Sequence, residues 1–331
     1  MKNKILLLCP VYYPYPAGGA QSFPIIAKVL STKFQVIVLT EFHFKKSLFE
    51  QEENINIFRI LPVRDNFGKK NFLYSCITYL LTYLIIYIFV FGNVLLGLRK
   101  LHFTRYIGTI IIPLLAILRL LNCKIVYDCR TGNNEERLNR YYKKIFKFCT
   151  IALANSKSAF SVLDNNADKN LPKYLIDNPL RLPNPIYKKE ILINKKVLLR
   201  RKYICCLGTI SSRKCSLMIL KAYLLSLKKL EENNYVKFIP KLVFAGRNDI
   251  GVEFKKFLCK DTKIIYAGEI THREALLLTS NSIGSINVSL CEGIPRSSLE
   301  ALCFGTPSIL SGAVPEFMEF CKESCFDVQH K

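Results

Sequence analysis

Cys291-Glu292-Gly293-Ile294-Pro295-Arg296-Ser297-Ser298-Leu299-Glu300 is the stretch of sequence that indicates the fold most clearly. It stands between two short apolar runs, at 285–288 and 308–310, that have the length and composition of buried strands. A glycine and a proline mark the turn in which the first strand ends, and the rest of the segment is long enough for a helix. A strand, a helix and a strand in this order form a β-α-β unit of a parallel sheet. We therefore expect a helix over 297–304.

The two carboxylates of this stretch, Glu292 and Glu300, lie eight positions apart. Glu300 has two interpretations. Ser297 can be the N-cap of the helix, with Glu300 completing a capping box. Alternatively, Glu300 lies in the first helical turn and accepts hydrogen bonds from a sugar hydroxyl such as a ribose diol. Glu292 has no capping role, and it follows a strand end, where a carboxylate can orient the hydroxyls of a bound sugar.

The same alternation of apolar strands and helical stretches continues in both directions along the chain. In the first half we expect strands at 5–9, 35–39, 55–60, 124–127 and 151–154, and helices at 20–31, 72–91, 110–121 and 134–148. In the second half we expect strands at 203–207, 241–245, 263–266, 285–288 and 308–310, and helices at 217–230, 273–279 and 297–304.

This pattern predicts an α/β protein of two Rossmann-like domains. At roughly 150 residues per domain, 331 residues suffice for two. We expect a first domain over 1–185, a linker over 186–202 where prolines give way to basic residues, and a second domain over 203–331. Two such domains place the carboxyl ends of their strands across a cleft, which is the expected ligand site.

Two loops carry residues that suit a phosphate group. Arg213 and Lys214 follow Gly208 in a loop between an expected strand and helix, where point charge and the helix N-terminus both favour a diphosphate. A solvated surface pair is the alternative. Gly18 and Gly19 follow the first strand and permit close approach of backbone to a ligand, although a plain turn explains them equally.

Asp128 and Arg130 stand at the end of the expected strand 124–127, where they either face the ligand site or belong to a loop that caps the next segment. The sequence offers little for metal chemistry. It has four histidines, no cluster with metal-ligand spacing and no Asp-x-Asp pair. We expect no metal and no cofactor, and the charge of a diphosphate would be neutralised by Arg213, Lys214 and helix amides.

Composition excludes an overall disordered chain and a disulfide scaffold. Half of the residues are hydrophobic and 22% are charged, whereas disordered chains have the opposite balance. The 13 cysteines are scattered, without a C-x2-C pair, which favours reduced thiols in a cytoplasm. The formal charge of +23 favours phosphate-rich partners or an anionic membrane surface, or reflects biased codon usage. No nucleic-acid-binding module is present, so nucleic acid is not an expected partner.

Residues 71–98 are 28 positions without a charge, enough to span a bilayer. A buried core helix and a helix dipped into the membrane interface are the other interpretations. If the flanking portions belong to one domain, a single span is impossible because it would separate them. A basic helix expected at 137–148 mixes cations and aromatics in a way that suits an anionic membrane surface, although a solvated amphipathic helix explains it too.

The second half resembles the retaining glycosyltransferases of family 4, which have the GT-B fold, and in particular those that build bacterial surface polysaccharides. The resemblance is carried by the Glu-x7-Glu pair within E-G-I-P-R-S-S-L-E-A-L-C-F-G-T-P-S-I-L. Supporting stretches are Gly208 to Lys214 with Ala222, Phe244-Ala245-Gly246-Arg247, Gly268-Glu269-Ile270, Asn155-Ser156 and Gly18-Gly19.

The resemblance implies a donor site for a nucleotide-diphosphate sugar. Glu300 would bind the ribose, Lys214 the diphosphate, and Glu292 the donor sugar as the catalytic carboxylate. The other donor-binding positions would be Arg213, Gly208, Gly293, Ile294 and Pro295, with Gly18 and Gly19 closing on the phosphates. The resemblance further implies metal-independent transfer with retention.

Independently of the resemblance, their place at a strand end makes Asp128 and Arg130 candidates for the cleft or the acceptor. The basic helix at 137–148 and the apolar stretch at 72–91 together suggest a lipid-linked glycan as acceptor, and a cytoplasmic protein peripheral on the inner face of the cell membrane.

Two departures from the family pattern are visible. Thr209 stands where family members often carry Arg, so Arg213 would substitute for it. The second half also ends at Lys331, several elements earlier than in related enzymes, so we expect a C-terminally truncated domain. The alternatives are an inactive or partner-subunit GT-B protein, which would not turn over, and a sugar-nucleotide epimerase, which would release a free epimer and need no acceptor.

Overall fold

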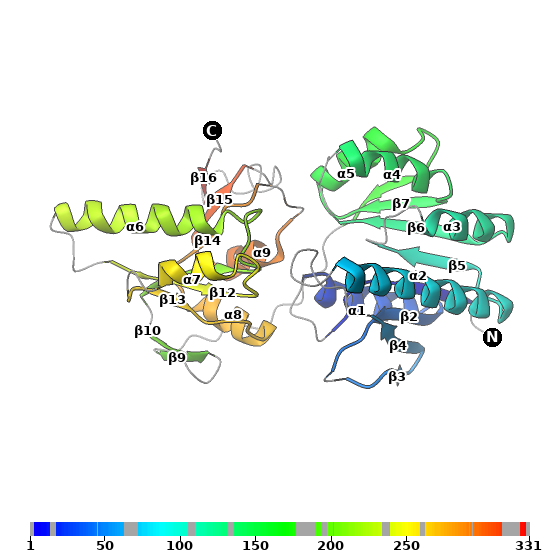
Figure 1. The fold of residues 1–331 in the computed structure, drawn as a ribbon, viewed down its shortest axis with the longest axis horizontal. Helices are drawn as coiled ribbons and strands as arrows, with labels where there is room; N and C mark the ends of the chain where they lie inside the picture. The colour runs from blue at the N-terminus through cyan, green and yellow to red at the C-terminus, as the bar shows by residue number, and fades with distance from the viewer. Residues whose placement is uncertain are drawn as a thin grey trace. The chain divides into compact units, whose positions relative to one another are not determined.

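The computed structural model describes residues 3–13, 18–44, 46–62, 72–104, 110–130, 136–176, 190–193, 197–200, 202–233, 239–258, 262–290, 292, 294–312 and 325–328. The chain divides into two compact units, Met1–Pro179 and Leu180–Lys331 (Figure 1). Each unit is a parallel sheet with helices packed on it, as the alternation of strands and helices predicts.

The first unit contains an eight-stranded sheet in the order β3-β4-β2-β1-β5-β6-β7-β8. Its strands are β1 (Lys4–Leu8), β2 (Gln35–Glu41), β3 (Phe49–Glu52), β4 (Ile55–Leu61), β5 (Lys100–Phe103), β6 (Lys124–Cys129), β7 (Ile151–Ala154) and β8 (Lys173–Leu175). Every neighbouring pair is parallel except β3 and β4. The central strands are apolar at nearly every position because both faces of a parallel sheet are covered by helices.

The helices of the first unit cover the two faces unequally (Figure 1). On one face α1 (Gly18–Ser31) packs Phe23 and Ala27 onto β1, β2 and β4. On the other face lie α2 (Phe72–Leu95), α3 (Ile111–Leu120), α4 (Glu136–Phe146) and α5 (Lys157–Asn166), which share one large core with the sheet.

Helix α2 settles the interpretation of the long apolar run. Among the described helices it alone is long and apolar enough to cross a bilayer, over Cys76–Leu95. Its flanking strands, β4 and β5, belong to the same sheet, so the helix cannot put them on opposite sides of a membrane. Its inner face, which includes Tyr83, Ile86 and Val90, is buried in the core of the unit. The transmembrane interpretation is therefore wrong.

The second unit contains a six-stranded parallel sheet in the order β13-β12-β11-β14-β15-β16. Its strands are β11 (Tyr203–Leu207), β12 (Lys241–Ala245), β13 (Ile264–Tyr266), β14 (Gly284–Asn287), β15 (Ser308–Ser311) and β16 (Cys325–Val328). Its helices are α6 (Ser216–Glu232), α7 (Val252–Leu258), α8 (His272–Ser280) and α9 (Arg296–Cys303).

The segment 186–202, assigned to a linker from its composition, contains an antiparallel hairpin of β9 (Glu190–Ile193) and β10 (Val197–Arg200). Ile191, Ile193 and Leu199 are buried in one cluster with Tyr203 of β11. Leu192, between the two isoleucines, is exposed. The buried side chains add the hairpin to the core of the second unit.

Candidate functional site

The second unit has a topological switch point between β11 and β14. From β11 the chain proceeds through β12 to β13 on one side, and β14, β15 and β16 follow on the other side. In open α/β sheets, ligands bind at the carboxyl ends of the strands where the order reverses in this way. The loops after β11 and β14 meet here, since the amide of Leu290 donates to the carbonyl of Arg213 at 2.9 Å.

Three neighbouring strands of this sheet lead into glycines with positive φ. Gly208 follows β11 (φ 121°), Gly246 follows β12 (φ 140°) and Gly268 follows β13 (φ 75°). A Cβ atom on Gly246 would lie 2.0 Å from the carbonyl oxygen of Gly208. The glycines therefore let the main chain of adjacent loops pack closely, and they leave backbone without side chains beside the switch point.

Glu292, Arg213 and Lys214 meet at the switch point. One carboxylate oxygen of Glu292 lies 2.6 Å from Lys214 Nζ and 2.8 Å from an Nη atom of Arg213. The side chains of Lys214 and Glu292 are each 14% exposed, whereas that of Arg213 is 54% exposed. The predicted diphosphate residues and the predicted sugar residue are thus brought together, with α6 beginning two positions after Lys214.

A diphosphate at this position would compete with Glu292 for the same two cations. Its charge exceeds that of one carboxylate, and Arg213 and Lys214 both donate hydrogen bonds in geometries that suit phosphate. The single Glu292 carboxylate pairs with both cations, so the three side chains together keep one positive charge.

Glu300 lies in α9 and is 3% exposed. Its Oε1 accepts a hydrogen bond from Nε of Arg296 at 3.0 Å, and Nε2 of His272 lies 2.7 Å from the same oxygen. Of the two interpretations of Glu300, the capping box with Ser297 does not occur: α9 begins at Arg296, its N-cap is Pro295, and no side chain caps it. Proline has its φ fixed near the value a helix start requires, so the helix begins earlier than the serine suggests.

A capping box does occur one helix earlier. Thr271 is the N-cap of α8, its hydroxyl accepts from the amide of Glu274, and the Glu274 carboxylate accepts from the amide of Thr271. This box fixes the start of α8 and with it His272, the first residue of the helix. Sequence analysis did not identify His272 or Arg296 as site residues. The Thr-x-x-Glu signal at 271–274 could have placed His272 at a helix start, but not beside Glu300.

A chain of hydroxyl and amide groups supports the Glu292 loop from below. Nδ2 of Asn287 donates to Oγ of Ser298 at 2.8 Å, and Oγ of Ser289 donates to Oδ1 of Asn287 at 2.9 Å. Oγ of Ser289 also lies 3.5 Å from Oε1 of Glu292, and Oγ of Ser311 donates to the carbonyl oxygen of Ser289. All of these supporting residues are buried. The network ties the loop after β14 to α9 and β15.

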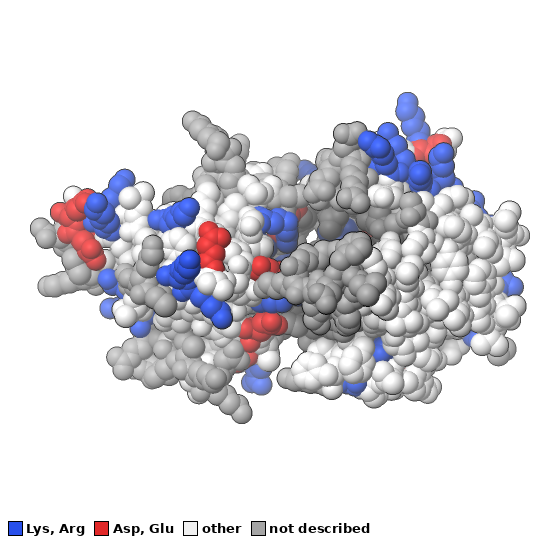
Figure 2. Space-filling view, viewed as in Figure 1, with Lys and Arg blue, Asp and Glu red and all other residues white. Residues whose placement is uncertain are grey.

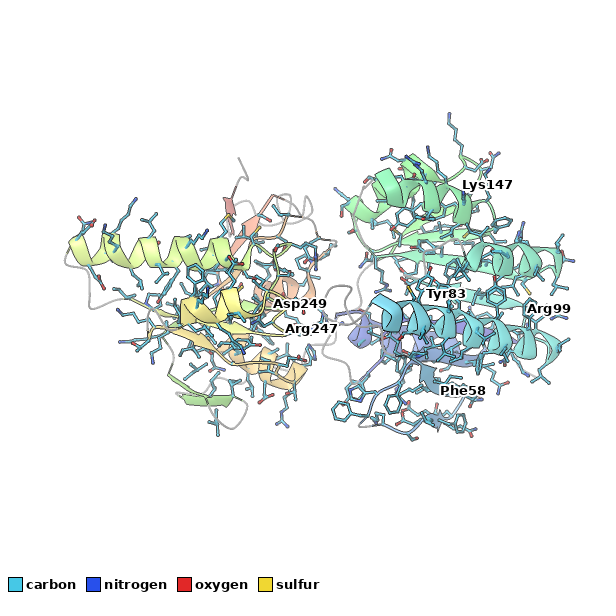
Figure 3. The ribbon with its side chains drawn as sticks, in the orientation of Figure 1. Phe58, Tyr83, Arg99, Lys147, Arg247 and Asp249 are labelled. Atoms are coloured by element: carbon cyan, nitrogen blue, oxygen red, sulfur yellow. The ribbon has the colours of Figure 1, made fainter. Side chains whose placement is uncertain are left out.

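Other predicted positions lie around these groups. Pro295 is buried and Ile294 is half-buried, whereas Gly293 lies outside the described residues. Arg247, which follows Gly246, forms a two-pronged pair with Asp249 at 2.8 and 3.1 Å (Figure 3). In the first unit, Gly18 and Gly19 are the first two residues of α1.

Asp128 and Arg130 form a second polar cluster at the carboxyl ends of β5 and β6 of the first unit. Oδ2 of the fully buried Asp128 accepts from Arg130 Nε at 2.9 Å, and Nε2 of His102 lies 3.3 Å from it. The Arg130 guanidinium lies over the ring of Phe23, 4.8 Å from its centroid. Oδ1 of Asp128 has no hydrogen-bond partner within the described part of the chain.

The charge state of Asp128 follows from these contacts. Burial raises the pKa of its carboxyl, but the positive charge of Arg130 and the hydrogen bond from His102 outweigh burial and bring the pKa below its ordinary value. Asp128 is therefore an ionised carboxylate that holds the Arg130 side chain.

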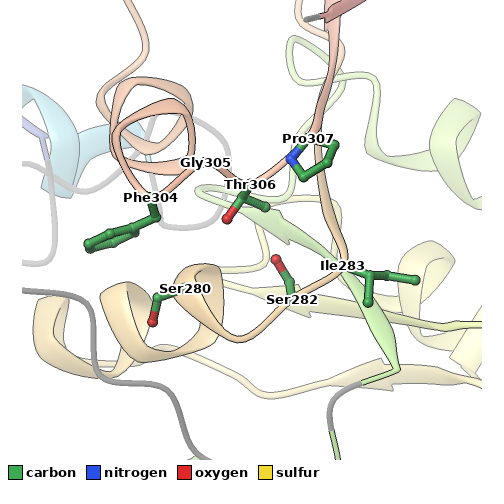
Figure 4. A pocket seen from close by; sticks show the side chains of 7 residues that line it. All are labelled: Ser280, Ser282, Ile283, Phe304, Gly305, Thr306 and Pro307. Carbon is green, nitrogen blue, oxygen red and sulfur yellow. The ribbon is translucent and has the colours of Figure 1, made fainter.

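No set of three His, Cys, Asp or Glu side chains in the described ranges is grouped as metal ligands. A pocket of about 680 Å³ lies at the opposite, amino-terminal edge of the second sheet, between Ser280, Ser282, Phe304 and Thr306 (Figure 4). The hydroxyls of Ser282 and Thr306 both donate to the carbonyl of Thr279. Because these two hydroxyls already donate hydrogen bonds within the protein, the pocket offers few polar groups to a ligand. The switch point is therefore the stronger candidate site.

No protein-family model matches the sequence, and no curated protein is significantly similar to it in sequence. Solved structures, in contrast, match almost its whole length. A sucrose-phosphate synthase from Thermosynechococcus elongatus is 13% identical, with a TM-score of 0.68, over 99% of this chain and 86% of its own. Anabaena HepE in complex with UDP-glucose is 14% identical, with a TM-score of 0.67, over 98% of this chain and 85% of its own.

A UDP-forming α,α-trehalose-phosphate synthase from Burkholderia vietnamiensis is similar as well, with 10% identity and a TM-score of 0.68 over 98% of this chain and 88% of its own. At these identities the likeness concerns the fold. The chain therefore has the GT-B fold, with two Rossmann-like units, as the sequence resemblance implies.

Proposed function

We propose that the protein is a glycosyltransferase that takes its sugar from a nucleotide-diphosphate donor bound at the switch point of the second unit. The observation that carries this proposal is the meeting of Lys214, Arg213 and Glu292 where the strand order reverses. Structures of similar fold include a sucrose-phosphate synthase, a UDP-forming trehalose-phosphate synthase and complexes with UDP and UDP-glucose, which supports a sugar nucleotide as ligand.

Each part of the donor has a partner in this arrangement. The diphosphate binds Lys214 and Arg213, and the amino-terminal end of α6 adds to the favourable potential. The ribose diol donates hydrogen bonds to Glu300, which Arg296 and His272 hold in place. Glu292, released from its two cations, accepts hydrogen bonds from hydroxyls of the donor sugar.

The reaction breaks the bond between the sugar and the diphosphate, so negative charge develops on the leaving oxygen. Lys214 and Arg213 stabilise that charge without a metal ion, because they are already positioned when the bond breaks. The family resemblance adds that the anomeric configuration is retained. No side chain is assigned as a nucleophile.

For the acceptor we propose a lipid-linked glycan in the synthesis of a surface polysaccharide, reached at the inner face of the cell membrane. Asp128 and Arg130 of the first unit are the proposed acceptor residues. The buried carboxylate of Asp128 holds the Arg130 guanidinium in one place. A guanidinium held in this way can bind an anionic or hydroxyl-rich acceptor.

Turnover of sugar nucleotides tests the proposal. The purified chain is given UDP-glucose and related UDP, GDP, ADP and CMP sugars with membrane lipid extract, and nucleotide release and lipid-linked products are measured. We expect release and a lengthened lipid-linked product with one donor, and loss of both with Glu292→Gln. Glu253→Gln, an exposed position on α7, is the matched control. Release of a free epimer, or the same turnover with Glu292→Gln, would contradict the proposal.

A further inference from the structure

Helix α2 presents a second apolar face on the side away from the core. Its outward positions form a continuous stripe of large aliphatic side chains that are between 45% and 88% exposed: Ile77, Leu80, Leu81, Leu84, Ile88 and Leu95. Apart from the adjacent Leu80 and Leu81, successive members are three, four or seven positions apart, which keeps these side chains on one side of the helix. At 1.5 Å per residue the stripe is roughly 27 Å long.

Helix α3 extends this surface. Tyr87 of α2 accepts a hydrogen bond from the amide of Leu114 at 3.1 Å, so the two helices lie side by side. Ile117, Leu120 and Leu121, at the end of α3, are exposed as well. Figure 2 shows a broad area free of charged side chains over α2 and α3. Contiguous apolar surfaces of this kind mark sites of contact with a membrane or a protein.

The surface is bordered by positive charge. From 66 to 127 the chain contains no Asp or Glu, and the exposed Arg99, Arg119 and Lys124 stand at the ends of α2, α3 and the loop that follows. On α4, which packs next to α3 on the same face, Lys143 and Lys144 are exposed, and Lys147 follows the helix.

The basic border continues over α4 and α5 (Figure 2). The Lys147 side chain points away from the unit (Figure 3), and blue atoms gather over α4 and α5 in Figure 2. The nearby Asp164 of α5 is paired with Lys173 at 2.8 Å. An apolar surface with a basic border is complementary to a bilayer that carries anionic headgroups.

We infer that the outer face of α2 and α3 is a membrane-docking surface, on which the first unit lies against an anionic bilayer with α2 parallel to the membrane plane. The exposed aliphatic side chains enter the boundary between headgroups and acyl chains, and the cations of α4 contact the phosphates. This deepens the proposed location at the membrane. It needs no sugar donor, so it is tested separately from the transferase activity.

The absence of tryptophan from the chain provides a sharp test, because one introduced Trp is the only indole fluorophore. Leu84→Trp places it in the middle of the α2 stripe. Leu225→Trp places it at an equally exposed position on α6 of the second unit, 57% against 56%. With vesicles of phosphatidylcholine and phosphatidylglycerol in equal parts, we expect the emission of Leu84→Trp to move to shorter wavelength and that of Leu225→Trp to stay unchanged.

Cosedimentation with the same vesicles separates the apolar and the electrostatic contributions. Leu80→Gln, Leu84→Gln and Ile88→Gln together should abolish binding. Lys143→Glu, Lys144→Glu and Lys147→Glu should weaken it at least about tenfold, since each cation near an anionic surface is worth roughly fivefold. The matched charge control is Lys221→Glu, Lys255→Glu and Lys256→Glu, all exposed in the second unit.

Circular dichroism and nucleotide binding serve as controls that the variants are folded. Two outcomes would overturn the inference. One is that the wild-type chain fails to bind the vesicles and instead forms a soluble dimer that the triple glutamine variant converts to a monomer. The other is that the α4 variant and its control lose vesicle binding equally, because then net charge, rather than this surface, attracts the bilayer.

Discussion

Gly246 is the residue whose identity is fixed most strictly by the main chain. It combines a φ of 140° with a Cβ position 2.0 Å from the carbonyl oxygen of Gly208. We predict that Gly246→Ala destabilises the second unit by at least about 2 kcal/mol, because strain at φ and a backbone clash add. Denaturant unfolding measures the change.

Gly284→Ala is the matched control for this substitution. A Cβ on Gly284 would meet its nearest neighbour, the carbonyl oxygen of Pro307, at an ordinary 3.5 Å, and its φ is not positive. We expect an effect within about 1 kcal/mol. Equal losses for the two alanine variants would show that the close approach of the two loops is not what requires glycine.

Asp128 should make the stability of the first unit depend on pH. Its pKa is lower in the folded chain than in the unfolded chain, so its contribution is present above the unfolded value of about 3.9 and is lost as pH falls through the folded value. We predict that Asp128→Asn costs about 3–5 kcal/mol at neutral pH, because Arg130 is left buried beside an uncharged amide. Denaturant unfolding of the first unit at a series of pH values measures the cost.

Asp164→Asn is the comparison, since Asp164 is half-exposed in its pair with Lys173. This substitution should lower the free energy of unfolding by less than about 1 kcal/mol. The cost of Asp128→Asn should shrink below about pH 4, where the carboxyl of the unfolded wild-type chain becomes protonated while that of the folded chain is still ionised. A cost that is the same at neutral pH and in acid would contradict an ionised Asp128.

At the scale of single residues, sequence reasoning succeeded where the position after a strand determines the surroundings. Glu292 and Lys214 each follow a strand, so the sequence could place both at the carboxyl edge of a sheet, but it could not show that the two strands are neighbours. His272 could not be placed beside Glu300, because the contact joins two helices 28 positions apart and depends on how they pack. The capping box at Ser297 failed because proline two positions earlier starts the helix.

Two glycines of the α2 region should respond in opposite directions to substitution by alanine. Gly92 lies within the helix with nothing within 4 Å of an added Cβ, whereas Gly97 follows the helix with a φ of 91°. We predict that Gly92→Ala stabilises the first unit by about 0.5–1 kcal/mol and that Gly97→Ala destabilises it by about 1 kcal/mol. Thermal unfolding measures both, and changes of the same sign would contradict the end assigned to α2.

At the scale of elements, apolar runs identified most strands of the two sheets, with ends shifted by at most two positions, but they missed β5 in the middle of the first sheet. The strands that pattern did not reveal are short or lie at edges. β5 has the sequence Lys-Leu-His-Phe, and β3 is Phe-Glu-Gln-Glu at an exposed edge. The buried His102 of β5 is tolerated because Asp128 of β6 is its partner, and that pairing is invisible until the strands are aligned.

For the whole molecule, two compact units imply that a ligand of one unit stabilises that unit first. The full chain should show one unfolding transition for each unit in scanning calorimetry. We predict that a bound nucleotide raises the unfolding temperature only of the transition whose temperature Gly246→Ala lowers. The stabilisation should approach about 2.7 kcal/mol when free nucleotide is 100 times Kd. A rise in the other transition would place the nucleotide in the first unit.

The class of fold was predictable from the alternation of strands and helices and from the Glu-x7-Glu stretch. The strand order was not written in the pattern. It follows from right-handed crossovers that run first to one side of β11 and then to the other. That reversal sets the ends of β11 and β14 side by side, and with them the cations and the carboxylate of the proposed donor site.

Calorimetric titration of nucleotides is the most direct test of this site. UDP, GDP, ADP and CMP, with their common sugar conjugates, are titrated into the wild-type chain, Glu300→Gln and the control Glu253→Gln. The account predicts that one nucleotide binds the wild type and the control alike, and that Glu300→Gln binds it at least about tenfold more weakly, as loss of a hydrogen bond to a charged group implies. A folded wild-type chain that binds none of them, or a Glu300→Gln variant that binds as tightly, would contradict a nucleotide-sugar site at the switch point.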